Sequence, residues 1–365
     1  MTPERIGIGA GSDESVLWIG RGVLDDSSQY LVSPSGRWLV VSSRNARSAA
    51  GRVRAAVGGT AILDLEIEDS EKTKTLDAVR EIADRAIAAG VRRDDAFVAV
   101  GGGVVTDVVG FAAAIVLRGI PWNAVPTTVA GMADAAIGGK TGVDHPLGKN
   151  LLGAFHPPRA VLIDPSAADA LPERDYRSGL VEAFKGAWIA DADLSARAES
   201  RVAAILARDG TALLDLVLGA ARVKAAIVTA DPLDRGARRI LNFGHTLGHA
   251  FEAAGGFQDL RHGEAVAWGI AAALLVSRDR AGLSEADASR VRSVLERLGP
   301  FPEPVRSRET LRSLLVRDKK ATAGGLAGVL LESVGRARVD ESIPVDEWLH
   351  AAELVSLSGV ETRPP

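Results

Sequence analysis

The histidines of this chain gather in one segment. Three of the six lie within the eighteen residues from His245 to His262. His245 and His249 are four residues apart and share one face of a helix. Imidazoles on one face are good zinc ligands, and a carboxylate commonly completes a catalytic site, for which Glu182 is a candidate beside Lys185 on an earlier helix. The pattern predicts a divalent metal centre. Spacing favours the pair His245 and His249, and it leaves His245 with His262 open.

A glycine-rich junction follows a predicted buried strand. Phe97–Val100 runs straight into Gly101, Gly102 and Gly103, and a helical segment comes next. Glycines let the backbone approach a phosphate, and a helix N-terminus offers free N–H groups. Thr106 stands where the third glycine of the dinucleotide fingerprint is expected. The junction therefore fits a nucleotide site and a tight structural turn about equally.

Lysine is scarce, with eight residues against thirty-five arginines. Lysine is a compact point charge, whereas arginine is a wide planar fork, so a retained lysine can mark a site where arginine cannot serve. Asp134 to Asn150 holds Lys140 and Lys149 in glycine-rich backbone, which suits an anionic, oxygen-rich ligand. A further basic group comprises Arg222, Lys224, Arg235, Arg238, Arg239, Arg317, Lys319 and Lys320.

Strand and helix signals alternate through the first half of the chain. This alternation predicts an α/β domain with a parallel, Rossmann-like sheet. After Leu171 the periodicity is helical almost throughout, with one strand signal at Leu326–Leu331. We therefore expect an N-terminal α/β domain over 1–170 and an all-α C-terminal domain over 171–365.

Composition excludes several classes of protein. The chain has 365 residues, a net charge of −4 and no cysteine. An acidic balance argues against nucleic acid as a partner. The longest apolar runs, such as Ala265–Val276, are too short to cross a bilayer, so no membrane partner is expected. These features predict a cytoplasmic location.

Taken together, the motifs resemble the dehydroquinate synthase family of sugar phosphate cyclases. The resemblance covers about residues 70–335, with ordered and specific spacing. The matching residues are Glu71 and Lys74, Gly101–Asp107, Arg118-Gly119, Pro126–Thr128, Gly138–Gly142, Gly148–Asn150, Glu182 with Lys185, Leu241–Thr246 with His249, His262–Glu264, and Asp318–Lys320.

The resemblance implies a lyase of the shikimate pathway, which leads to chorismate and the aromatic amino acids. Its substrate is a phosphorylated sugar acid, 3-deoxy-D-arabino-heptulosonate 7-phosphate, and its products are 3-dehydroquinate and phosphate. The implied cofactors are NAD, regenerated in each turnover, and a divalent metal, zinc or cobalt. The family suggests a homodimer. The alternatives are a secondary-metabolism sugar phosphate cyclase and a metal- and NAD-dependent polyol or glycerol-phosphate dehydrogenase.

The resemblance also implies a role for each matched residue. The metal ligands become Glu182, His245 and His262, in place of the pair favoured by spacing, and His249 becomes a proton-handling or supporting group. Substrate and phosphate would meet Asp134, Lys140, Asn150, Lys185, Lys224, Arg238, Asn242, Arg118 and one of Lys319 and Lys320, with Lys149 also near the substrate. NAD would meet Glu71, Lys74, Gly101, Gly102, Gly103, Asp107, Thr127, Thr128 and Lys149.

Four departures from the family pattern stand out. Asp234 replaces a usual glutamate, Thr106 a usual glycine, and Ala135-Ala136 two serines. Ser42-Ser43 stands where an Asp or Asn often meets the adenosine ribose. Relatives that make other cyclitols often alter Gly138–Lys140, Asn242 or His249. This chain keeps those residues, which favours dehydroquinate formation.

Overall fold

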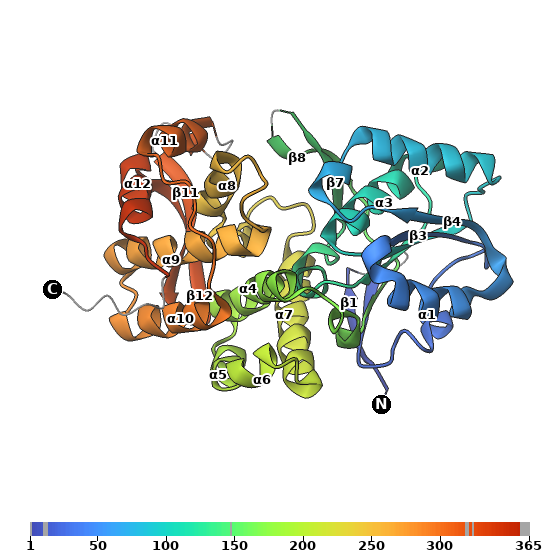
Figure 1. Cartoon of the computed structure of the whole chain (residues 1–365), viewed down its shortest axis with the longest axis horizontal. Helices are drawn as coiled ribbons and strands as arrows, with labels where there is room; N and C mark the ends of the chain where they lie inside the picture. The colour runs from blue at the N-terminus through green and yellow to red at the C-terminus, as the bar shows by residue number, and fades with distance from the viewer. Residues whose placement is uncertain (1, 10–13, 147, 318–320, 323–324, 358–365) are drawn as a thin grey trace. The chain divides into compact units, whose positions relative to one another are not determined.

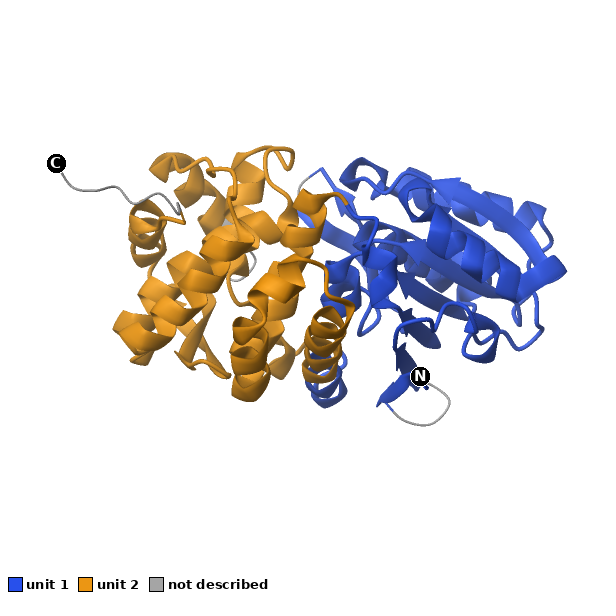
Figure 2. Ribbon diagram, turned by 60° about the horizontal axis from the view of Figure 1, so that its bottom comes forward, with its two compact units in different colours: residues 1–171, 224–233 blue, residues 172–223, 234–365 orange. Residues whose placement is uncertain are grey.

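The computed structural model of the chain describes residues 2–9, 14–146, 148–317, 321–322 and 325–357. The chain forms two compact units, Met1–Leu171 with Lys224–Leu233 and Pro172–Val223 with Asp234–Pro365 (Figure 2). The ten residues from Lys224 therefore belong with the N-terminal unit, although the sequence pattern placed them in the second domain.

The N-terminal unit is built on a seven-stranded sheet of order β1-β2-β9-β6-β5-β3-β4. Every pairing is parallel except that of β1 with β2. The strands are β1 (Glu4–Ile8), β2 (Ser15–Ile19), β3 (Trp38–Ser43), β4 (Ala61–Ile67), β5 (Ala96–Gly101), β6 (Trp122–Pro126) and β9 (Ala160–Ile163).

Helices cover both faces of this sheet, which explains why the central strands are apolar without alternation. The helices are α1 (Arg47–Val57), α2 (Leu76–Ala88) and α3 (Gly103–Ile115). Figure 1 shows α1 on one side of β3 and β4, and α2 with α3 on the other. Val98 and Val100 of β5 share a buried cluster with Ala50 and Val53 of α1.

The strand order reverses beside β3, which pairs with β4 on one side and with β5 on the other. In an open parallel sheet, the crevice at such a switch point is the usual nucleotide site. Gly101 ends β5 at this edge and Ser43 ends β3. The topology thus brings the glycine junction to the position where a dinucleotide would bind.

A two-stranded hairpin, β7 (Lys140–His145) with β8 (Gly148–Phe155), carries the glycine- and lysine-rich segment. The sequence pattern did not predict these strands. Close backbone approach explains two of the glycines, because a Cβ on Gly153 would lie 2.1 Å from the Thr141 carbonyl oxygen and one on Gly142 would lie 2.5 Å from that of Leu152.

The C-terminal unit is mainly helical, as expected, but it is not purely so. A three-stranded antiparallel sheet joins β10 (Ala321–Thr322), β11 (Gly325–Ser333) and β12 (Arg336–Ile343). The helices are α4 (Glu173–Ala190), α5 (Ala192–Ser200), α6 (Val202–Leu206), α7 (Gly210–Ala230), whose last turns belong to the other unit, α8 (His245–Ala254), α9 (His262–Ala281), α10 (Glu285–Leu298), α11 (Arg308–Arg317) and α12 (Val345–Leu354).

Helix α9 is the core of this unit. It packs against α4, α8, α10, α12 and β11, and this enclosure explains why its apolar residues run around the whole helix. No helix in the described ranges has both the length and the apolar character required to cross a membrane.

Candidate active site

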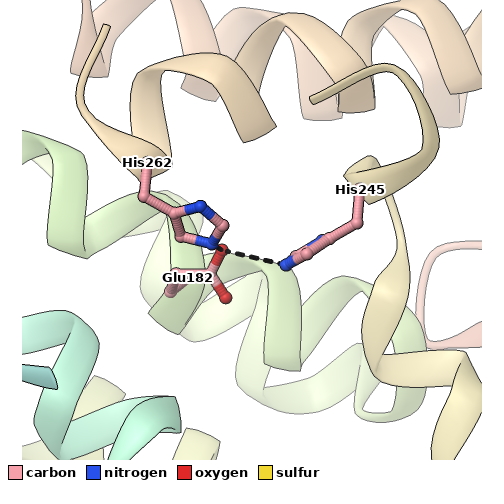
Figure 3. A group of neighbouring side chains, drawn as sticks. All are labelled: Glu182, His245 and His262. Carbon is pink, nitrogen blue, oxygen red and sulfur yellow. Dashed lines mark ion pairs between the residues drawn. The ribbon is translucent and has the colours of Figure 1, made fainter. Parts of the chain in front are cut away.

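Three helices of the C-terminal unit bring Glu182, His245 and His262 together (Figure 3). Glu182 Oε1 lies 3.8 Å from His245 Nε2 and 3.6 Å from His262 Nε2. One donor atom from each residue lies within 4.8 Å of the others. One carboxylate oxygen and two imidazole nitrogens are a donor set typical of a catalytic zinc site.

The Glu182 carboxylate is suited to a cation. Its side chain is 1% exposed, and Lys185 Nζ lies 2.5 Å from Oε2. Within the described part of the chain, neither of its oxygens accepts a hydrogen bond of good geometry. A buried carboxylate without hydrogen bonds requires nearby positive charge, which Lys185 supplies here and a bound divalent ion would also supply.

His245 presents a free nitrogen lone pair to this set. Its Nδ1 donates a hydrogen bond to the Phe243 carbonyl oxygen at 3.0 Å, so Nε2 is unprotonated in the neutral ring. Burial lowers the pKa of His245 well below its usual value, and the positive charge of Lys185 lowers it further. The neutral, ligand-competent form is therefore the stable one near pH 7.

Two contacts hold the start of α9, and hence His262, against α4. Gly263 N–H donates to Ser178 Oγ at 3.0 Å, and a Cβ on Gly263 would lie 1.9 Å from the Ser178 carbonyl oxygen. Arg174 donates to both oxygens of Glu264, at 2.6 and 2.7 Å. Ser178 lies one turn before Glu182 on α4, so this packing places His262 beside the carboxylate.

His249 lies on α8 one turn beyond His245 and is exposed. Its ring centroid is 5.2 Å from that of His245 and 6.1 Å from that of His262. It does not belong to the set with Glu182, although it forms a second possible group with Glu252 and His262. Its position fits the supporting or proton-handling role that the resemblance implies.

In the N-terminal unit, the glycine junction opens a helix. Gly102 is the residue before α3, and its N–H donates to Asp69 Oδ2 at 2.9 Å. A Cβ on Gly102 would lie 2.9 Å from that oxygen and 3.0 Å from Thr128 Cγ2, so glycine is needed for Asp69 and Thr128 to approach the backbone this closely. The glycine backbone at the N-terminus of α3 is of the kind that binds a dinucleotide phosphate.

Thr106 is accommodated without a glycine. Its hydroxyl donates to the Gly103 carbonyl oxygen at 3.0 Å, and its side chain is buried within α3. Ser42 and Ser43 also have local roles. Ser42 Oγ accepts from Arg54 at 3.0 Å, and Ser43 Oγ accepts from the Asn45 N–H at 3.1 Å.

The matched charged residues of this unit form ion pairs with one another. Lys74 Nζ lies 2.7 Å from Asp107 Oδ2, and Lys149 Nζ lies 2.9 Å from Glu71 Oε1. Burial lowers the pKa of Lys74, but the negative charges of Asp107, Glu71 and Asp144, with the hydrogen bond to Asp107, together outweigh burial and raise the pKa overall. Lys74 therefore keeps its positive charge. The Asp144 N–H donates to the Lys74 carbonyl oxygen at 2.9 Å, which joins the β7–β8 hairpin to this group.

Lys224 and Asp134 are ninety residues apart in sequence and in contact in space. Lys224 Nζ donates to the Asp134 carbonyl oxygen at 2.7 Å and also contacts its carboxylate. Asp134 lies in a π-helical turn, Gly131–Ala135, and such turns are frequent at functional sites.

The remaining candidates differ in exposure. Lys140 and Asn150 are exposed on the hairpin, and Asn150 has a positive φ of 53°. Arg118 is exposed with a φ of 69°.

Other candidates are buried or half-buried. Arg238 is buried in a short 3₁₀ segment, Ala237–Asn242, which ends at the half-buried Asn242. Thr127 is buried and Thr128 is half-buried, directly after β6. Lys319 and Lys320 lie outside the described residues.

Sequence reasoning missed three acidic residues at these sites. Asp69 accepts from Gly102, Asp144 accepts from the Asn150 N–H at 2.8 Å, and Glu252 contacts His262. Glu252 carried a signal, since it lies three residues after His249 and seven after His245. Asp69 and Asp144 lie in loop and hairpin segments, where no periodicity marks them.

The fold and these residues define the class: a parallel α/β unit with a nucleotide-type switch point, followed by a helical unit that carries a metal-type donor set. Comparison with known proteins identifies the family. Two family models match the chain. The one described as 3-dehydroquinate synthase N-terminal matches residues 64–178, and the one described as 3-dehydroquinate synthase C-terminal matches residues 179–321. A 3-dehydroquinate synthase of Geobacter metallireducens is 44% identical over 281 residues, which cover 77% of this chain and 78% of the relative.

Two solved structures share the whole architecture. A 2-epi-5-epi-valiolone synthase from Streptomyces hygroscopicus, solved with NAD+ and Zn2+, has a TM-score of 0.84 at 31% identity and covers 95% of this chain and 97% of its own. A 2-deoxy-scyllo-inosose synthase, solved with carbaglucose-6-phosphate, NAD+ and Co2+, has a TM-score of 0.86 at 25% identity. The match covers 97% of this chain and 100% of the synthase chain. The chain belongs to the 3-dehydroquinate synthase family.

Proposed function

We propose that this chain converts 3-deoxy-D-arabino-heptulosonate 7-phosphate to 3-dehydroquinate and phosphate, with catalytic NAD and a divalent metal. The observation that carries the proposal is the convergence of Glu182, His245 and His262 in a chain whose family is 3-dehydroquinate synthase. NAD is regenerated, so the net reaction is a phosphate elimination with ring closure and no net oxidation.

The two units supply different groups in this proposal. The N-terminal unit, corresponding to the predicted domain 1–170, would hold NAD through Glu71, Lys74, Gly101, Gly102, Gly103, Asp107, Thr127, Thr128 and Lys149. The C-terminal unit, corresponding to 171–365, would hold the metal, zinc or cobalt, through Glu182, His245 and His262. When bound, a divalent cation lowers the pKa of a coordinated hydroxyl and polarises a carbonyl, and NAD accepts and returns a hydride.

The chain's own residues bind and orient the substrate. Lys140, Lys149, Lys185 and Lys224 supply point charges for carboxylate, phosphate and hydroxyl oxygens, since each ammonium offers three rotatable donors. Asp134, Asn150, Arg238 and Asn242 would fix the hydroxyls and the carboxylate, and Arg118 with one of Lys319 and Lys320 would hold the phosphate. The substrate phosphate can accept the proton in its own elimination, so these residues chiefly position it.

His249 would move a proton near the reacting oxygen. It is exposed and lies one turn from His245, so it can exchange protons with solvent while its neighbours hold the metal. We further propose that the chain works as a homodimer in the cytoplasm. Light scattering of the purified protein tests the dimer.

The test is an assay with four components: the protein, the heptulosonate phosphate, NAD and zinc. We expect equal amounts of phosphate and 3-dehydroquinate, with no accumulation of NADH. Steady NADH formation from an alcohol would instead identify a dehydrogenase. Phosphate release from a heptulose 7-phosphate without a carboxylate, and none from the heptulosonate, would identify a secondary-metabolism cyclase.

A further inference from the structure

A buried carboxylate beside the metal set has no role in the chemistry above. Glu252 is 3% exposed and lies on α8, seven residues after His245 and so on the same face. Both of its oxygens lie 3.4 Å from His262 Nδ1. A charge this deeply buried is costly unless it is paired, so its position beside an imidazole calls for an explanation.

The two imidazoles of the set are held in parallel ways. His245 Nδ1 donates to a backbone carbonyl, and its Nε2 faces Glu182 Oε1. His262 Nδ1 faces Glu252, and its Nε2 faces the same oxygen of Glu182. In each ring, one nitrogen meets an acceptor and the other is directed to the centre of the set.

The two rings differ in how tightly packing confines them. The side chain of His245 is 8% exposed, whereas that of His262 is 42% exposed and belongs to the first residue of its helix. Packing can orient His245. His262 needs a specific contact to hold its ring, because much of its side chain is exposed to solvent.

We propose that Glu252 is a positioning residue for the metal site. It accepts a hydrogen bond from His262 Nδ1–H, which fixes the tautomer and leaves the Nε2 lone pair directed toward Glu182. Its negative charge also makes the imidazole a stronger ligand. The inference rests on the proposed metal set and adds the residue that makes His262 competent within it.

A competing role for Glu252 is ligation of a second ion. His249, Glu252 and His262 also have donor atoms within 4.8 Å of one another. An ion held there through His262 Nδ1 would be incompatible with an Nδ1–H that donates to Glu252. Metal stoichiometry separates the two roles.

The experiment is a zinc titration of the metal-free, full-length chain in competition with a chromophoric chelator. Glu252→Gln keeps the shape and removes the charge, and we expect zinc affinity to fall about tenfold. Glu252→Ala removes the acceptor, and we expect a fall of up to about 100-fold. The Co2+ form of each variant should show a changed visible absorption spectrum. Glu199→Gln is the matched control, because Glu199 accepts from Ser195 and Arg290 and touches none of these groups.

Unchanged zinc affinity in both Glu252 variants would overturn the inference, whatever their folding stability. A stoichiometry of two zinc ions per wild-type chain and one per Glu252→Gln chain would also overturn the inference, because it would show that Glu252 binds a second ion. His262→Ala separates the inference from the proposed function. If that variant retains wild-type zinc affinity, the metal set itself is wrong. If it loses zinc while the Glu252 variants bind normally, only the role of Glu252 fails.

Discussion

Lys185 and Glu182 form an ion pair one turn apart on α4, with Lys185 Nζ 2.5 Å from Glu182 Oε2 and both side chains no more than 2% exposed. The lysine supplies the positive charge that the buried carboxylate requires when no cation is bound. A divalent ion at Glu182 would share the carboxylate with this lysine. We therefore expect Lys185 to stabilise the metal-free fold and to oppose metal binding at Glu182.

Lys185→Met should separate these two effects. The metal-free variant should be less stable than wild type by about 3–5 kcal/mol, because the Glu182 charge is left buried without its partner. Zinc should reduce this difference in stability between variant and wild type, because the variant lacks the competing ammonium and gains more stability from zinc binding. Urea unfolding with and without zinc measures the free energy of unfolding of each protein in each state. Lys72→Met, at an exposed lysine outside the motifs, is the control, and a gap that zinc leaves unchanged would count against the metal set.

Gly263→Ala tests how α9 is docked. The added Cβ would lie 1.9 Å from the Ser178 carbonyl oxygen, so the start of α9 must move away from α4 and carry His262 with it. We expect a loss of about 1–3 kcal/mol of stability and about tenfold weaker zinc binding. Gly51→Ala, where the Cβ meets nothing within 4 Å in α1, should instead gain stability. Wild-type zinc affinity in Gly263→Ala would show that this contact does not position His262.

Lys140→Arg keeps the charge at the start of β7 and changes its shape. Arg is a planar fork, and a site built for a point charge will misplace the substrate. We expect kcat/KM for the heptulosonate phosphate to fall about 100-fold while the urea midpoint stays unchanged. Lys72→Arg is the matched control for the same substitution. Turnover equal to that of wild type would remove Lys140 from the substrate site.

His156 should make the stability of the protein depend on pH. Its Nε2 donates to the Ile120 carbonyl oxygen at 2.8 Å, and burial lowers its pKa below the ordinary 6.5. Below pH 6.5 the unfolded chain therefore binds more protons than the folded one, so this contribution is present above that pH and is lost as pH falls. In His156→Asn, the free energy of unfolding should decline less steeply below pH 6.5. A slope in His156→Asn identical to that of wild type would contradict the assignment.

Local pattern was a good guide to the regular elements. The strand expected at Phe97–Val100 lies within β5, and the strand signal at Leu326–Leu331 lies within β11. The helical periodicity expected after Leu171 is interrupted at Arg201, where the backbone leaves helical geometry between α5 and α6. The β7–β8 hairpin escaped prediction because its glycines and charges resemble those of a loop, and its register depends on backbone contact at Gly142 and Gly153.

The sequence by itself determined the residue types that can do chemistry here: histidines within one short segment, lysines in an arginine-rich chain, and glycines after a buried strand. Spacing favoured His249 over His262 as the partner of His245, because helix periodicity relates only residues on one element. The tertiary structure groups His262 with His245 at Glu182, since Gly263 lets α9 begin against α4. It also decided that Lys224 contacts Asp134 and that Glu252 lies beside His262. Those contacts arise from packing between elements distant in sequence, which no local pattern records.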